Sequence, residues 1–136
     1  MGAVIAVAAT VAPAHASNVT VTLSVGAVKY GSTISDCALS VPAGADGVVV
    51  LDAAVAKGCI SSYHVQHYTF GNFVDCIDGV CGDPSPVFAT YWGEYWDGSA
   101  ASLGVDSFRA GTQHDLGFSY VTWVNCLEPN PTCDQF

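Results

Sequence analysis

The chain has 136 residues, enough for one domain, and it combines twelve Asp and Glu residues with only three Lys and Arg residues. The formal net charge is −9 at pH 7, which repels phosphate backbones and anionic lipid headgroups. Composition therefore argues against nucleic acids and anionic membranes as partners. We interpret the scattered carboxylates as a solubilising surface.

The first sixteen residues differ from the rest of the chain. Gly2 to Pro13 is an uncharged run rich in Ala and Val, and Ala14-His15-Ala16 follows it. An apolar run that ends in a small-x-small site is typical of a secretory signal peptide, and about twelve apolar residues are too few to span a bilayer. We expect residues 1–16 to be a removed signal peptide and residues 17–136 to form a single secreted domain. A buried N-terminal helix is the alternative, but the run lacks polar periodicity.

All six cysteines lie after the predicted signal peptide. An even number of cysteines in an exported chain predicts three disulfides and no metal site. Gly and Pro turn residues lie inside Cys76–Cys81 and Cys126–Cys133, so both pairs can close locally, which leaves Cys37 to pair with Cys59. Six cysteines allow many other connectivities, and this pairing is one of them.

Two elements are expected before residue 60. Asn18 to Val25 alternates Val and Leu with Thr and Ser, which predicts a half-buried strand. An Ala-rich segment before Gly58 predicts a short helix over about residues 50–57, with Lys57 in its last turn and Gly58 as a left-handed stop.

Strand patterns resume at Tyr63. We expect tight turns at Asp78-Gly79 and Asp97-Gly98, and a loop over Gly82–Pro86, because two prolines in three residues do not fit a central strand. The predicted strands are Tyr63–Phe70, Phe73–Ile77, Val87–Trp96 and Asp115–Val124. The sum is a mostly antiparallel sheet of about five strands with one short helix across it, an α+β architecture.

The strand over 87–96 carries the candidate binding residues. Period-two alternation places Tyr91, Gly93 and Tyr95 on one face and Trp92, Glu94 and Trp96 on the other. We expect the face with Glu94 to be wet, which would leave Trp92 or Trp96 partly exposed. Exposed Trp and Tyr are enriched where proteins grip partners, so this aromatic strand is the predicted ligand contact. Packing under the Pro-rich loop is the alternative.

Catalytic and metal motifs are weak. The sequence contains no nucleophile elbow, zinc-protease motif, P-loop or dinucleotide fingerprint. His64 and His67 fall on opposite faces of a strand, which disfavours a shared metal, and His114 lies in a turn expected to be solvated. Glu94 and Asp97 beside aromatic residues are the best enzyme-like cluster, as in a glycan hydrolase. A lone Glu in such a strand is more often simply exposed, so we predict a non-catalytic protein that requires no cofactor.

The ordered motifs resemble the transcobalamin-like C-terminal domain, which also occurs as a stand-alone module in secreted bacterial proteins. The resemblance spans about residues 47–123. It rests on the segments Gly47–Lys57, Tyr68–Val80, Tyr91–Gly98, Ser102–Gly104, Phe108–Gly111 and Leu116–Trp123.

The resemblance implies a ubiquitin-like β-grasp fold. In the vitamin B12 carriers this domain closes over one face of the corrinoid, which implies cobalamin as a possible bound ligand and Tyr91, Trp92, Gly93, Glu94 and Tyr95 as its contacts. Two features depart from the pattern. The helical barrel that completes the family's site is absent from these residues, and Thr112 follows Gly111 where an Asp is usual.

The sequence therefore supports three candidate functions. The first is a secreted binding module that contacts a corrinoid or another ligand through Tyr91–Trp96. The second is an extracellular protein–protein interaction or self-assembling structural domain. The third, and least favoured, is a hydrolase built around Glu94 and Asp97.

Overall fold

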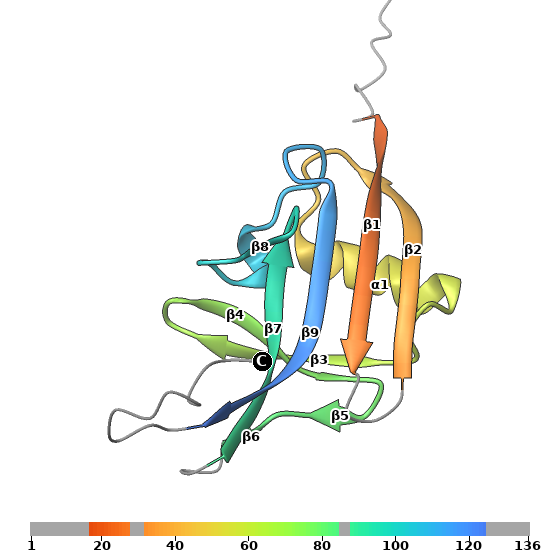
Figure 1. Cartoon of the computed structure of the whole chain (residues 1–136). Coiled ribbons are helices and arrows are strands. Elements are labelled where there is room, and N and C mark those ends of the chain that lie inside the picture. The colour runs from red at the N-terminus through yellow and green to blue at the C-terminus, as the bar shows by residue number, and fades with distance from the viewer. Residues whose placement is uncertain (1–16, 28–31, 85–87, 125–136) are drawn as a thin grey trace, which may run out of the picture.

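Two β-sheets and a helix make up the computed structural model, which describes residues 17–27, 32–84 and 88–124 (Figure 1). The larger sheet has six strands in the order β2-β1-β9-β7-β6, with β8 paired to β7, and the smaller has the order β3-β4-β5. A helix, α1 (Gly47–Lys57), and a 3-10 turn, η3 (Val105–Ser107), complete the described elements. The strands are β1 (Asn18–Ala27), β2 (Ser32–Pro42), β3 (Tyr63–Tyr68), β4 (Gly71–Ile77), β5 (Val80–Cys81), β6 (Asp83–Pro84), β7 (Phe88–Trp96), β8 (Ser99–Ala100) and β9 (Asp115–Val124).

The centre of the larger sheet is a parallel pair, β1 and β9, in which Leu23 lies opposite Leu116. The hairpin partner β2 is antiparallel to β1, and β7 is antiparallel to β9. The first and last described long strands are therefore neighbours. This non-local pairing places the two ends of the described chain at the centre of the larger sheet.

Alternation along β1 explains how the core forms. Val21 and Leu23 are fully buried, whereas Thr22 and Ser24 between them are only partly buried. Val50, Leu51 and Ala54 of α1 are also fully buried and belong to the same core cluster. The period-two pattern thus directs one face of the sheet onto α1 and leaves the other face outside the core. The predicted strands at residues 18–25 and 115–124 are confirmed.

The helix ends where predicted but starts earlier. Gly58 adopts a left-handed conformation, with φ 89°, and its N–H donates to the Ala54 and Val55 carbonyls. At the other end the carboxylate of Asp46 accepts a 3.0 Å hydrogen bond from the Val49 N–H. This N-cap starts the helix at Gly47 rather than near residue 50, because it satisfies an otherwise unpaired helix donor.

Both predicted tight turns are present. Asp78 and Gly79 have φ values of 53° and 79°, and Asp97 and Gly98 have values of 50° and 85°. Two successive residues with positive φ are typical of the type I′ turn, whose twist suits a β-hairpin. These turns join β4 to β5 and β7 to β8.

The sheet composition differs from the prediction. A single, mostly antiparallel sheet of about five strands is wrong, because the described residues form a mixed six-stranded sheet and a separate three-stranded one. The sequence did not predict β2. Its buried residues Cys37, Leu39 and Val41 do alternate with exposed ones, but the exposed residues are too weakly polar to reveal the pattern. Within the predicted loop, Asp83 and Pro84 pair with β7 as a short edge strand, where a missing proline N–H is tolerated.

Two disulfides are present in the described residues. Cys37–Cys59 ties β2 to the residue that follows the helix stop, and Cys76–Cys81 crosses the β4–β5 hairpin. These are two of the three pairs named from the sequence. The third pair, Cys126–Cys133, and the predicted signal peptide over 1–16 lie outside the described residues.

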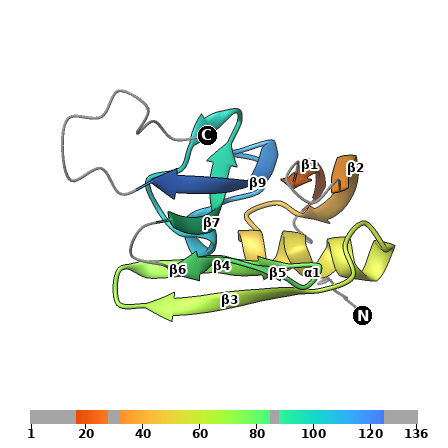
Figure 2. The ribbon, with the colours of Figure 1, turned by 60° about the horizontal axis from the view of Figure 1, so that its bottom comes forward.

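The smaller sheet and α1 lie on the same side of the larger sheet (Figure 2). Tyr63, the first residue of β3, donates a hydrogen bond from its hydroxyl to Asp52 of α1. The backbone N–H of Asn72 on β4 donates to the Asp106 carboxylate of η3 at 2.9 Å. The opposite side of the larger sheet is not covered by any described element.

A glycine-to-alanine pair tests how closely α1 and η3 pack. A Cβ at Gly47 would lie 2.3 Å from Val105 Cγ2 and 2.7 Å from the Val105 carbonyl oxygen, and Val105 is fully buried. We expect Gly47→Ala to lower the free energy of unfolding by about 1–3 kcal/mol, because the elements must separate to admit the methyl group. Urea unfolding followed by Trp fluorescence measures this. Gly26→Ala is the control, since no atom lies within 4 Å of its Cβ position; equal loss in both variants would contradict the packing argument.

Candidate ligand-binding site

The side chains of the aromatic strand β7 alternate between its two faces as predicted, but the face that is buried is the one expected to be exposed. Trp92 is only 6% exposed and Glu94 and Trp96 are partly buried, whereas Tyr91 is 38% exposed. The expectation that the Glu94 face is wet is therefore wrong, and Trp92 is buried. Of the two tryptophans that were expected to be partly exposed, only Trp96 is. Burying two large indoles on one face is more favourable in free energy than burying one carboxyl group is unfavourable, provided that the carboxyl group forms a hydrogen bond.

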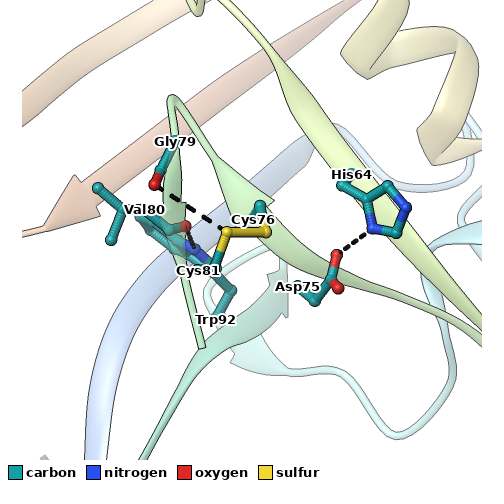
Figure 3. Close-up of polar contacts among 7 residues, drawn as sticks. All are labelled: His64, Asp75, Cys76, Gly79, Val80, Cys81 and Trp92. Carbon is teal, nitrogen blue, oxygen red and sulfur yellow. Dashed lines mark hydrogen bonds and ion pairs between the residues drawn. A yellow bond between two sulfur atoms is a disulfide. The ribbon is translucent and has the colours of Figure 1, made fainter. Parts of the chain in front are cut away.

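The Trp92 indole joins the two sheets. Its Nε1–H donates a 2.8 Å hydrogen bond to the Val80 carbonyl of β5 (Figure 3). Its ring meets Tyr120 edge to face with 5.0 Å between centroids. The Tyr120 hydroxyl bonds the Cys81 carbonyl and Thr90 Oγ1, both at 2.8 Å. Trp92 thus packs beneath the disulfide-closed β4–β5 hairpin.

Glu94 is an internal carboxyl group. Its Oε2 accepts a 2.5 Å hydrogen bond from Trp96 Nε1, while Oε1 is buried and has no hydrogen-bond partner within the described part of the chain. Burial raises the pKa of Glu94 to about 7, the Trp96 hydrogen bond opposes this, and the Asp106 charge adds to it. The side chain is therefore substantially protonated near neutral pH.

Asp97 occupies the exposed turn after β7. Its Oδ1 accepts hydrogen bonds from the backbone N–H groups of His114 and Asp115, both at 2.8 Å, and these bonds hold its pKa below the usual value. Neither Glu94 nor Asp97 lines either of the grooves described below. The two carboxyl groups of the hydrolase hypothesis are thus separated, one in the interior and one in a turn.

An exposed aromatic cluster lies on the β3–β4 hairpin. Tyr68 is 50% exposed and Phe70 is 71% exposed. Their rings stack with 5.1 Å between centroids, and Phe73 lies 6.0 Å from Tyr68 and 5.7 Å from Phe70. Large exposed apolar groups that touch one another are typical of a binding surface.

The cluster forms one wall of a groove between the β3–β4 hairpin and the β6–β7 edge. This aromatic groove has a volume of about 680 Å³, and Tyr91 and Trp92 lie on its opposite wall. Its complete lining is Gln66, Tyr68, Phe70, Phe73, Val74, Asp75, Gly82, Asp83, Pro84, Ala89, Thr90, Tyr91 and Trp92.

The polar part of the aromatic groove is acidic. Asp75 and Asp83 line it, and no Lys or Arg is among its described lining residues. His64 Nδ1 lies 2.7 Å from Asp75 Oδ1, so this histidine of β3 approaches the acidic wall (Figure 3). Within the described residues, no group of three or more His, Cys, Asp or Glu is placed to hold a metal ion.

The predicted contacts are thus divided among three places. Tyr91 and Trp92 line the aromatic groove, and Tyr95 lines a different groove on the larger sheet. Glu94 and Trp96 are partly buried and line neither groove. Gly93 lines neither. The aromatic residues Tyr68, Phe70 and Phe73 were not predicted. Their sequence signal is three aromatics within six residues around the Gly71 turn.

Together these features define a mostly-β, disulfide-bonded domain with an aromatic groove. Its fold is similar to that of haptocorrin in the crystal structure of haptocorrin in complex with Cbi, with a TM-score of 0.61 and 21% sequence identity. The match covers 77% of this chain and 25% of the haptocorrin chain, so the chain spans about a quarter of that protein. This likeness shows that the two proteins share a similar fold over the matched residues.

The other comparisons found nothing. No family model matches the chain, and no curated protein matches it. Among the described helices, none is both long enough and apolar enough to cross a membrane.

The buried Glu94 predicts a stability effect of unusual sign. Its pKa is about 7 in the folded state and 4.5 as the reference value, so the folded state holds the proton more tightly. Stability from this group is lost as pH rises from about 4.5 to about 7, because the unfolded state ionises first. We expect Glu94→Gln to be more stable than the wild type by about 1–3 kcal/mol near pH 8 and nearly equal to it near pH 4.5.

Denaturant unfolding across that pH range measures the difference. Asp97→Asn is the matched control of opposite sign, since the Asp97 pKa is lowered on folding and its loss should destabilise at neutral pH. A Glu94→Gln stability difference that does not change with pH would show that Glu94 does not titrate as described.

Proposed function

We propose that this chain is a secreted, non-catalytic binding module of β-grasp fold that holds a flat, largely apolar ligand in the aromatic groove. The observation that supports this most is the hairpin cluster of Tyr68, Phe70 and Phe73. Phe70 is 71% exposed, and burying such a side chain is worth about 1.5–3 kcal/mol. A ligand that covers the cluster would recover that free energy.

The β-grasp part of the proposal rests on connectivity. A parallel central pair, β1 and β9, is flanked by the antiparallel β2 and β7, and α1 crosses the covered face. The likeness to part of haptocorrin supports the same assignment. Secretion is supported by the two described disulfides, which persist in oxidising surroundings.

A corrinoid is the ligand that we propose. Haptocorrin is the neighbour whose structure contains the corrinoid Cbi. Tyr91 and Trp92, which the family resemblance named as contacts, line the aromatic groove here. Trp92 would act mainly by positioning the hairpin, because its indole already bonds Val80.

The chemistry of the groove agrees with a ligand of this kind. Stacked aromatic side chains suit a flat, extended ring system. Asp75 and Asp83 can accept hydrogen bonds from peripheral amide groups, and they would repel an anionic periphery. The separation of Glu94 from Asp97 supports binding rather than hydrolysis.

Isothermal titration of the purified chain with cobinamide and cobalamin tests the proposal. We expect Phe70→Ala and Tyr91→Ala each to weaken binding by about tenfold, as expected when an aromatic contact worth about 1.4 kcal/mol is removed. Leu103→Ala is the control, because Leu103 is 50% exposed but does not line the groove.

Two results would overturn the assignment. Absence of binding at millimolar corrinoid removes the ligand, and equal affinity of wild type and Phe70→Ala removes the groove. Light scattering in the same experiment detects the alternative, self-association, which would appear as a dimer that Phe70→Ala dissociates.

A further inference from the structure

The uncovered side of the larger sheet carries a second groove, separate from the aromatic groove. This open-face groove has a volume of about 520 Å³ and crosses β2, β1, β9 and the end of β7. In Figure 1 the helix lies behind the sheet, so this is the side turned toward the viewer. The groove is floored by small residues that alternate with the core positions: Thr22, Ser24, Gly26, Gly117 and Ser119.

Tyr95 lies along the sheet at one end of this groove. A Cβ at Gly93 would lie 3.3 Å from Tyr95 Cε2 and 3.4 Å from its hydroxyl oxygen. A Cβ at Gly117, the cross-strand partner of Tyr95, would lie 3.6 Å from Tyr95 Cβ. Glycine at both positions therefore leaves room for the phenol ring to fold back over β7. One side of the ring rests near the backbone, and the other borders the groove.

Carboxylate and hydroxyl groups line the rest of the groove. Ser24 Oγ donates a 2.6 Å hydrogen bond to Asp36 Oδ1, which holds the Asp36 carboxylate beside the groove. Asp115 lines the groove on β9. A carboxylate accepts about four hydrogen bonds, so the bond from Ser24 leaves Asp36 with capacity for a ligand. The two basic side chains in the described residues, Lys57 and Arg109, donate to backbone carbonyls elsewhere.

The lining restricts the class of ligand. Two carboxylates with no Lys or Arg among the described lining residues repel phosphates and carboxylic acids. An organic cation is best held by aromatic rings on several sides, and this groove has one tyrosine and one mostly buried phenylalanine, Phe118. A neutral sugar ring matches both parts of the groove, since it has an apolar C–H face and a rim of hydroxyl donors.

We propose that the open-face groove binds a neutral saccharide. One sugar ring stacks its C–H face on Tyr95 of β7, and hydroxyls along the saccharide donate charge-assisted hydrogen bonds to Asp115 of β9 and, further across the sheet, to Asp36 of β2. The hydroxyls of Ser119 and Thr22 can donate and accept, and Ser24, whose proton is bonded to Asp36, can accept, which suits the remaining sugar groups. This site shares no residue with the aromatic groove, so it does not depend on the corrinoid proposal.

Saturation-transfer NMR and calorimetry with neutral tetrasaccharides of glucose and of N-acetylglucosamine test the site. A shallow groove with one stacking ring predicts dissociation constants of about 1 mM. We expect Tyr95→Ala to weaken binding at least about tenfold and Tyr95→Phe to retain most of it, because stacking rather than the hydroxyl dominates. Asp36→Asn should weaken it by a smaller factor, since the amide still accepts a hydrogen bond.

Leu103→Ala is the control, because Leu103 is 50% exposed and lines neither groove, so its loss should leave saccharide binding unchanged. Circular dichroism confirms that each variant is folded. The proposal fails if neither sugar series binds at tens of millimolar, or if Tyr95→Ala binds like the wild type. It also fails if tetramethylammonium, titrated in parallel, displaces the saccharide with higher affinity, which would make the groove a cation site.

Discussion

The indole of Trp92 connects the two layers of the molecule, because its N–H donates to the Val80 carbonyl and its ring packs against Tyr120. Tyr120 in turn bonds the Cys81 carbonyl, so two aromatic side chains of the larger sheet hold the same short hairpin. The Cys76–Cys81 disulfide keeps that hairpin closed. The aromatic groove lies between the β3–β4 hairpin and the β6–β7 edge, and β4 belongs to both hairpins of the smaller sheet, so holding β5 also positions the wall of the groove. Its shape therefore depends on a polar contact inside the protein as much as on the residues that line it.

The same contact determines the orientation of β7. Once Trp92 points inward, alternation brings Glu94 and Trp96 inward as well and turns Tyr91, Gly93 and Tyr95 outward. A buried carboxyl group is costly when ionised, and the structure accommodates it with the Trp96 hydrogen bond and a raised pKa. The inward orientation of Trp92 thus requires the unfavourable burial of the Glu94 carboxyl group. The same orientation places the tyrosines of β7, with a glycine between them, on the outer face of the strand.

Local features of this fold were predictable from sequence, and long-range ones were not. Gly58 and the Asp78-Gly79 and Asp97-Gly98 pairs have conformational preferences that act within a few residues, so the helix end and both turns were correctly predicted. The parallel β1–β9 pair and the division into two sheets depend on contacts between distant segments. The burial of Glu94 was missed for a related reason. A charged residue favours water on average, and only the neighbouring indoles reverse that preference. Tyr68, Phe70 and Phe73 are visible in the sequence, but their exposure requires knowing that no described element covers the hairpin.

Two surfaces of different chemistry follow from one sheet. On the side that packs against the hairpin, stacked aromatic rings dominate, and the groove is suited to a flat apolar ligand. On the uncovered side, Gly93 and Gly117 let a single tyrosine lie over a floor of glycine and hydroxyl groups. Both surfaces contain carboxylates and no described Lys or Arg, in agreement with the net charge of −9. Charge therefore excludes anions from both grooves, while the number of aromatic rings distinguishes what each can hold.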